Sequence, residues 1–209
     1  MDQHVIDAQI RWPDVPAAYG WLSLDPRGNW RLHESGTSGN GEPGATITNP
    51  QIIGFIHRNY THDDQGHWFF QNGPQRVFVR LDAAALILHY MATDASFTAH
   101  TGEASGTVQG WWLDDQGRLF TRTPLGPGMI VDRDLMIVLD AMTLHDDSPS
   151  PETSRSADAL LDRLSTLQGG EHVLVDHPAS DGPVRLQRIA DANVPDALGF
   201  VRAPEEPAK

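Results

Sequence analysis

The sequence predicts an α+β protein in which antiparallel β-hairpins pack with two helices. Three observations support this prediction. Short apolar segments are joined in pairs by turn sequences rich in Asp, Gly and Pro. Two longer segments carry apolar residues at helical spacing. The order hairpin, helix, hairpin then occurs twice along the chain, which favours a duplicated ββαββ unit.

The first hairpin and the first helix have clear local signals. Residues 21–24 and 30–32 flank the turn Asp25-Pro26-Arg27-Gly28, and Pro at the second position with Gly at the fourth is typical of a type I turn. Residues 52–60 carry an apolar stripe that predicts a helix. The preceding Thr48-Asn49-Pro50 offers a capping residue, Thr48 or Asn49, and a Pro suited to the first helical position.

A second hairpin is predicted from residues 68–70 and 76–81, which are joined across Asn72-Gly73-Pro74. In its second arm, Val77, Val79 and Leu81 alternate with Arg76, Phe78 and Arg80. This alternation indicates a strand with one buried face and one largely solvated face.

The second half of the chain repeats these signals. Residues 111–113 and 119–120 flank the turn Asp114-Asp115-Gln116-Gly117, and residues 129–139 predict one or two further strands. Residues 157–167 carry a second amphipathic helical stripe. The remaining signals are Gly169-Gly170 as a helix stop and a last hairpin formed by residues 172–175 and 184–189.

These elements predict two related subdomains separated by polar segments. The boundaries expected are 1–92 for the first subdomain with a flexible loop at 34–45, 93–107 for a linker, 108–202 for the second subdomain with a flexible loop at 145–156, and 203–209 for a tail. The loops are rich in Gly, Pro and Ser and lack large apolar side chains, so they bury little surface.

An internal repeat is the strongest pattern in the sequence. Trp21 and Trp111 lie 90 residues apart, and Trp68 and Val173 lie 105 apart, with the same elements in the same order between them. A rival register comes from Asp63-Asp64-Gln65-Gly66, which recurs as Asp-Asp-Gln-Gly 51 residues later. Because this tetrapeptide is favourable turn chemistry and arises independently, the longer repeat is preferred.

Composition excludes several classes of protein. The chain has 15 Lys and Arg against 28 Asp and Glu, a net charge of −13, and therefore lacks the basic patch that binds nucleic-acid phosphates. It has no Cys, which excludes disulfides, thiolate zinc sites and Cys nucleophiles. No apolar stretch is long enough to span a membrane, and the first residues do not resemble a secretory signal. We expect a cytoplasmic protein without a cofactor and without nucleic-acid or membrane partners.

One group of side chains is an alternative metal site. His57, His62 and His67 recur every five residues, with Asp63 and Asp64 between them. Imidazole and carboxylate ligands with an open position would form a hydrolytic zinc centre. Five residues is not the spacing of one helix face, however, and residues 62–66 have turn character. Exposed histidines are therefore the preferred interpretation, and no metal site is predicted.

Two places are candidates for ligand contact. The polar run at the second hairpin contains Asn72, Gln75 and Arg76, more hydrogen-bonding groups than a tight turn needs. Trp111 and Trp112 are adjacent in a predicted strand, so they face opposite sides, and an exposed Trp would mark a binding surface. The alternatives are a solvated turn for the first and core packing for the second.

A family resemblance is carried by four runs of the first half. They are Gly28-Asn29-Trp30-Arg31-Leu32, Ile47-Thr48-Asn49-Pro50, Asp64-Gln65-Gly66-His67-Trp68-Phe69 and Arg76-Val77-Phe78-Val79, followed by Leu81-Asp82-Ala83. Over residues 20–90 the chain resembles the uncharacterised bacterial family called domain of unknown function 1285, or a close neighbour of it, although the Gly-rich segment 34–45 departs from that pattern. The resemblance implies an α+β fold with repeated motifs and a signalling or ligand-sensing role, and it assigns no functional residue.

These observations predict a non-enzymatic ligand-sensing or adaptor protein that binds a small molecule or a protein partner, with a homodimer left open. No catalytic set is clustered in the sequence. The alternative is a metal-assisted hydrolase that uses the region of His57, His62 and His67.

Overall fold

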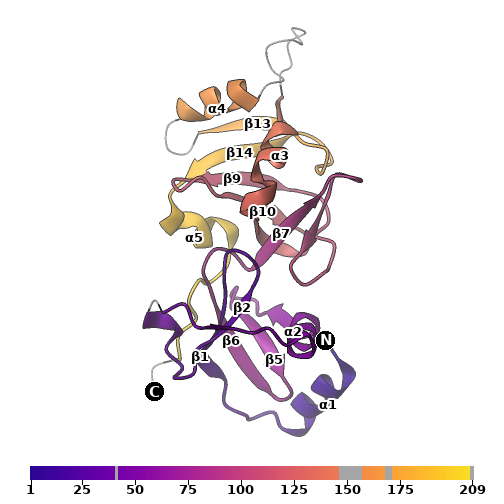
Figure 1. The fold of residues 1–209 in the computed structure, drawn as a ribbon, viewed down its shortest axis with the longest axis vertical. Helices are drawn as coiled ribbons and strands as arrows, with labels where there is room; N and C mark the ends of the chain where they lie inside the picture. Colours follow the sequence, from indigo (N-terminus) through magenta and orange to yellow (C-terminus); the bar gives the residue numbers. More distant parts are fainter. Residues whose placement is uncertain (41, 146–156, 168–170, 208–209) are drawn as a thin grey trace. The chain divides into compact units, whose positions relative to one another are not determined.

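The computed structural model describes residues 1–40, 42–145, 157–167 and 171–207. The chain forms two compact units (Figure 1). Unit 1 consists of Met1–Ala85 together with Gly199–Lys209, and unit 2 consists of Leu86–Leu198. Each unit contains one β-sheet and several helices, so the α+β class predicted from the sequence is confirmed.

Unit 1 is built on a six-stranded sheet in the order β3-β2-β1-β6-β5-β4. The central strands β1 and β6 are parallel, and the other neighbouring pairs are antiparallel. Its elements are α1 (Gln3–Arg11), β1 (Ala18–Leu24), β2 (Trp30–Leu32), η1 (Ser38–Asn40), β3 (Ala45–Thr46), α2 (Pro50–Arg58), β4 (Tyr60–His62), β5 (Trp68–Asn72) and β6 (Gln75–Leu81). The two predicted hairpins are present, and they join side by side through the parallel β1–β6 pair.

Three strand connections share one turn, anchored by Asp25, Asp63 and Asp114. In each, the Oδ1 atom of the Asp accepts hydrogen bonds from the backbone N–H groups two and four residues later, at 2.7–3.0 Å. The third residue after each Asp is a glycine with a φ of 77–83°, a left-handed conformation that glycine adopts without strain. The Asp-x-x-Gly pattern therefore sets three of the tight turns in the protein.

The α2 helix packs on the sheet of unit 1 beside β5 (Figure 1). It begins as predicted, because the Asn49 side chain accepts hydrogen bonds from the backbone N–H groups of Gln51 and Ile52 and Pro50 occupies the first turn. Ile56 is its buried residue, and the Phe55 ring packs edge-on against the Phe70 ring.

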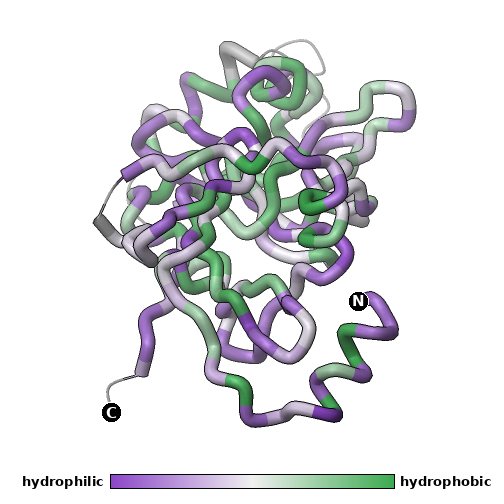
Figure 2. Tube along the Cα trace, turned by 60° about the horizontal axis from the view of Figure 1, so that its bottom comes forward, coloured by the Kyte–Doolittle hydropathy of each residue, from purple (hydrophilic) through white to green (hydrophobic). Residues whose placement is uncertain are grey.

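The α1 helix is attached to α2 through a few contacts. Asp2 pairs with Arg58 at 3.0 Å, His4 stacks on Phe55, and Val5 is buried. Hydrophilic and hydrophobic stretches alternate along this N-terminal segment (Figure 2). Its far end leaves Ile10 and Trp12 exposed.

The last segment of the chain returns to unit 1. The backbone N–H of Leu81 donates to the carbonyl of Arg202 at 2.8 Å, and the N–H of Val201 donates to the carbonyl of Gly66 at 2.9 Å. Phe200 is buried. Residues that follow unit 2 in the sequence therefore pack against the six-stranded sheet of unit 1 and belong to that unit.

Unit 2 contains an eight-stranded sheet in the order β12-β13-β14-β9-β10-β11-β7-β8. Two of its pairs are parallel, β14 with β9 and β11 with β7, and the others are antiparallel. Its elements are β7 (Leu86–Met91), β8 (Ser96–Ala99), β9 (Gly110–Asp114), β10 (Leu119–Thr123), β11 (Gly126–Ile130), η2 (Asp132–Asp134), α3 (Leu135–Asp140), β12 (Thr143–Leu144), α4 (Ala157–Ser165), β13 (His172–Asp176), β14 (Val184–Ile189), η3 (Asp191–Asn193) and α5 (Val194–Leu198).

The core of unit 2 is centred on an aromatic cluster. Trp111 packs edge-on against Phe97 and against His177, with ring centroids 5.9 and 5.3 Å apart, and Tyr90 lies 5.8 Å from His177. Trp111, Phe97 and His177 are all buried. Phe97 lies on β8, so the β7–β8 hairpin contributes directly to this core.

Several sequence expectations need correction. The sheets are mixed rather than built only of antiparallel hairpins, and the described residues contain five α-helices rather than two. Residues 129–139 were expected as strands, but only the end of β11 is extended there, followed by η2 and most of α3. A continuous apolar run does not distinguish a strand from a buried helix, which explains this error.

The polar segments also differ from expectation. Residues 93–107, expected as a linker, contain β8 and lie within unit 2, and residues 86–92 also belong to unit 2. Residues 34–45, expected as a flexible loop, contain η1 and the first residue of β3, with Ser38 buried. Residues 146–156, Gly169-Gly170 and the last two residues of the expected tail lie outside the described residues.

None of the helices within the described ranges has the length and apolar character needed to span a membrane.

Candidate functional site

An apolar groove of about 780 Å³ opens on one face of the unit 1 sheet. It is lined by residues of β1, β2, β3, β5, β6 and α2 and by the connection between β3 and α2. The lining residues are Ala18, Trp21, Leu22, Leu32, Ala45, Thr46, Ile47, Thr48, Asn49, Ile52, Ile56, Phe70, Gln75 and Val77. The volume lies in the range of small-molecule sites in proteins.

The groove has a buried base and an exposed rim. Leu22, Ile56 and Phe70 are buried and belong to the core of unit 1. Leu32 and Ile52 retain 42% and 48% of their surface and lie at the opening. Exposed aliphatic side chains beside a recess of this size are typical of a ligand-binding surface.

The polar groups at the groove are few and mostly engaged. The Asn49 side-chain oxygen caps α2, accepting from Gln51 and Ile52 at 2.9 and 3.4 Å. Gln75 donates from Nε2 to the carbonyl of Pro16 at 3.0 Å. The Thr46 hydroxyl accepts a hydrogen bond from Arg31. Among the residues that the structure describes, no charged side chain lines the groove.

The predicted contact residues of the second hairpin are divided between the two faces of the sheet. Gln75 lines the groove, whereas its neighbour Arg76 projects to the opposite face, since side chains alternate along a strand. The Arg76 guanidinium lies 4.7 Å from the centre of the Phe69 ring. Asn72 is exposed at the end of β5. These three residues therefore do not form one site, and only Gln75 belongs to the groove.

A smaller recess of about 400 Å³ lies beside Arg76. Its lining includes Pro13, Gln71 and Pro74. The side chain of Gln71 is buried, its Nε2 donates to the carbonyl of Gly73 at 2.9 Å, and its Oε1 has no hydrogen-bond partner among the described residues.

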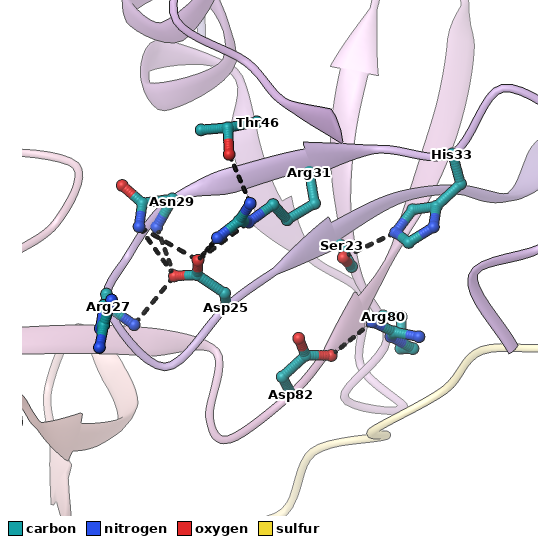
Figure 3. Close-up of polar contacts among 9 residues, drawn as sticks. All are labelled: Ser23, Asp25, Arg27, Asn29, Arg31, His33, Thr46, Arg80 and Asp82. Atoms are coloured by element: carbon teal, nitrogen blue, oxygen red, sulfur yellow. Dashed lines mark hydrogen bonds and ion pairs between the residues drawn. The ribbon is translucent and has the colours of Figure 1, made fainter. Parts of the chain in front are cut away.

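A cluster of polar side chains in unit 1 joins the β1–β2 hairpin to the end of β6 (Figure 3). Asp25 pairs with Arg31 at 2.7 Å, and Arg80 pairs with Asp82 at 2.9 Å. Burial opposes ionisation of Asp25, but hydrogen bonds from Asn29 and Arg31 outweigh it and lower the pKa of this carboxyl. Burial raises the pKa of Asp82 despite the neighbouring guanidinium.

Ser23 and His33 form a buried pair in the same region. The Ser23 Oγ lies 2.9 Å from His33 Nε2 (Figure 3), in the arrangement of a nucleophile and its base. Burial, with a smaller contribution from Arg80, lowers the pKa of His33. Ser23 has no exposed surface, however, so no substrate reaches its hydroxyl. The pair satisfies two buried polar groups and is structural. Sequence reasoning missed it because no motif relates the two residues.

The structure does not bring His57, His62 and His67 together around a common point. His57 packs on Trp30, with ring centroids 6.2 Å apart, and burial lowers its pKa. His67 bonds to Asp63 at 2.9 Å, and His62 packs on Trp68. Within the described residues, no three His, Cys, Asp or Glu side chains are placed to hold a metal ion. The described residues therefore give the alternative metal site no support.

Of the two adjacent tryptophans, Trp111 requires correction as a contact residue. They face opposite sides of β9 as expected, but Trp111 is fully buried within the aromatic cluster of unit 2. Trp112 is half-buried, with the Arg122 guanidinium 5.9 Å from its ring. Trp111 therefore belongs to the core, which is the alternative interpretation given for it, and contact through Trp112 stays a prediction.

Most of the groove was not predicted as a site. In the sequence, Leu22 and Leu32 belong to the arms of the first predicted hairpin and Ile52 belongs to the apolar stripe of the predicted helix, and none of them is a candidate contact residue.

Comparison with known proteins gives a family without an assigned activity. A family model described as "Protein of unknown function (DUF2946)" matches residues 1–205. Among curated proteins, no match was found.

Two solved structures are similar to this chain. A DUF1285 family protein from Silicibacter pomeroyi DSS-3 has a TM-score of 0.47 and 12% sequence identity, covering 70% of this chain and 81% of that protein. A DUF1285 family protein from Shewanella baltica OS155 has a TM-score of 0.38 and 12% identity, covering 55% of this chain and 87% of that protein. The predicted resemblance to DUF1285 or a close neighbour is confirmed.

Proposed function

Because the chain belongs to the DUF2946 family of proteins of unknown function, we propose its function from its own structure: it is a non-enzymatic protein that binds a small molecule in the groove of unit 1. In this proposal the protein senses the ligand rather than transforming it. Gln75 is the one residue that both sequence and geometry associate with the site.

The groove is the observation that carries this proposal. It combines a volume of about 780 Å³, an aliphatic and aromatic lining and a rim of exposed Leu32 and Ile52. A recess lined mainly by apolar side chains with a few polar groups is the usual form of a ligand site. Leaving such a surface in water is unfavourable by about 25 cal/mol per Å², so a ligand that covers it gains affinity.

The lining itself supports binding without chemistry. Among the described residues, the lining contains no Ser–His pair and no carboxylate. Its two Thr hydroxyls are the only groups that could act as nucleophiles, and no general base lies beside them in the described lining. The Ser23–His33 pair lies on the other face of the sheet and is buried.

We further propose that the two units are copies of one ancestral ββαββ-containing module. The supporting observation is strand order: β3-β2-β1-β6-β5-β4 in unit 1 corresponds to β11-β10-β9-β14-β13-β12 in unit 2, with the same parallel and antiparallel pairs. The helix that corresponds to α2 in this order is α3, between β11 and β12, rather than α4. The β7–β8 hairpin is then an addition.

The repeat also supports a specialised role for unit 1. Asp25 and Asp114 anchor the same turn at the ends of β1 and β9. Counting back from them, Trp111 corresponds to Leu22 rather than to Trp21. Leu22 borders the groove, whereas the larger Trp111 is packed in a closed aromatic core. The two copies would thus have diverged into a binding unit and a closed unit.

The proposal is tested with the neutral dye Nile red, whose fluorescence rises in apolar sites. We expect the wild-type protein to bind the dye at one site. Ala18→Phe places a ring in the groove from β1 and should abolish binding. Ala92→Phe makes the same change at an exposed position of unit 2 and should leave binding intact. Absence of dye binding to the wild type, or equal binding to Ala18→Phe, would refute the proposal.

A further inference from the structure

We infer that the ligand of the groove is an uncharged molecule with an apolar body, such as an alcohol, amide or ester of an aliphatic chain. This inference rests on the proposed function and names the class of ligand. We argue it from the charges and hydrogen-bonding groups of the lining. Groups that already bond within the protein are not counted as partners for a ligand.

The lining provides no partner for a charge. In the described part of the chain, none of the side chains that line the groove is acidic or basic. An ion placed against Leu22, Val77 and Phe70 would lose hydration without gaining a counter-charge, which is strongly unfavourable. The net charge of −13 adds a general repulsion for anions.

The helix terminus at the groove does not replace the missing cation. The N-terminus of α2 would attract an anion through its unpaired N–H groups. Here the Asn49 side chain already accepts from Gln51 and Ile52, and the Ile53 N–H donates to the Asn49 carbonyl at 3.0 Å. Arg31, on the adjacent strand β2, donates to the Thr46 hydroxyl of the lining, but its charge is already paired with Asp25 at 2.7 Å.

A peptide is also a poor match. Each residue of a bound peptide carries a backbone N–H and C=O that need partners when buried. Besides the Trp21 indole N–H, the polar side chains of the lining are those of Thr46, Thr48, Asn49 and Gln75, and three of these four already have hydrogen bonds within the protein. A ligand with one polar group needs only one or two hydrogen bonds. Thr48, or the amide atoms of Asn49 and Gln75 that are not already bonded, can supply them.

The test uses three probes with the same ten-carbon chain and different head groups: 1-decanol, decanoate and decyltrimethylammonium. Each is titrated, below its micelle concentration, against the Nile red complex of the full-length protein. We expect decanol to displace the dye, and both ions to bind at least about ten-fold more weakly.

A charge substitution at the rim sharpens the test. Leu32→Lys places an ammonium at the opening of the groove, at a position exposed enough to leave the fold intact. We expect it to shift the ratio of the two dissociation constants at least about ten-fold toward decanoate over decanol. Leu174→Lys is the matched control, because Leu174 is also 42% exposed but lies on β13 in unit 2. It adds the same net charge and should leave the ratio unchanged.

The outcomes separate this inference from the proposed function. If Nile red binds but either ion displaces it as well as decanol does, or no probe displaces it, the uncharged-chain inference is overturned and the groove remains a binding site. If Nile red does not bind at all, the proposed function itself fails. If Leu32→Lys instead converts a wild-type dimer to a monomer in light scattering, a second copy of the chain covers the groove, and the inference is overturned.

Discussion

Protonation of His177 should destabilise unit 2 as the pH falls. The ring is buried among Tyr90, Phe97 and Trp111, and its Nδ1 accepts a hydrogen bond from the backbone N–H of Ala179 at 3.0 Å. Burial among apolar rings disfavours the charged imidazolium and lowers the pKa of His177 from 6.5 to about 4.

The sign and size of the effect follow from proton linkage. Between pH 6.5 and 4 the unfolded chain binds a proton at this position that the folded protein does not bind, so the free energy of unfolding decreases as the pH falls through this range. The stabilisation is fully present above pH 6.5. Between pH 7 and pH 5, His177 alone should remove about 2 kcal/mol of stability.

The assay compares the wild type with His177→Asn. An Asn side chain can still accept from the backbone N–H two residues later, so the turn is retained while the titratable ring is removed. Urea unfolding is followed through amide resonances of β9 and β10, which report on unit 2, at pH 7 and pH 5. The variant starts less stable because packing is lost, but its decrease between the two pH values should be about 2 kcal/mol smaller than that of the wild type.

Val138→Ala is the control for lost packing. Val138 is fully buried in α3, so the substitution destabilises unit 2 without removing a titratable group. Its decrease in stability between pH 7 and pH 5 should equal that of the wild type. The reasoning is refuted if His177→Asn and the wild type lose the same free energy over this range.

Three further substitutions test how the fold is held together. Phe200→Ala should lower the stability of unit 1 by about 3–5 kcal/mol, seen as faster amide exchange in β6 with no change in β9, because Phe200 is buried. Asp114→Asn keeps an acceptor for the turn but removes the charge paired with Arg118, and should lower the free energy of unfolding of unit 2 in urea by about 3 kcal/mol. A decrease below about 1 kcal/mol would contradict a buried ion pair. Gly20→Ala should lower the free energy of unfolding by at least about 2 kcal/mol, measured as a lower Tm, because φ is +79° and a Cβ would overlap the Gly36 carbonyl oxygen. An unchanged Tm would show that the loop around Gly36 moves aside.

The sequence predicts elements that depend on neighbouring residues. Asn49 and Pro50 begin α2 as expected, since capping is a local interaction. The hairpins around Asp25 and Asp114 form as expected, since the Asp-x-x-Gly turn supplies its own hydrogen bonds. Pairings between distant segments were not predicted. The parallel β1–β6 and β9–β14 pairs join strands far apart in sequence, and no local pattern specifies them.

The missed hairpin β7–β8 has a similar explanation. Residues 86–91 are apolar but were assigned to the end of a subdomain, since the polar stretch that follows has the composition of a linker. In the structure, Phe97 from that stretch is buried against Trp111. One aromatic residue among Ser and Thr is a weak signal, although its contribution to packing is large.

The candidate site could be predicted only in part. Gln75 was singled out because of its polar neighbours, and it lies at the groove. The rest of the lining comes from β1, β2, β3, β5, β6 and α2, which tertiary pairing brings together. A concave apolar surface is a property of that assembly, and each contributing residue alone is indistinguishable in sequence from a core residue.

The return of the chain to its first sheet affects the order of folding during synthesis. Residues 1–85 emerge from the ribosome before the segment that covers Gly66 and pairs with Leu81, and all of unit 2 is translated in between. Unit 2 is continuous in sequence and can complete its own core while the chain is still attached to the ribosome. Unit 1, although most of it precedes unit 2 in the sequence, should therefore reach its final structure after unit 2.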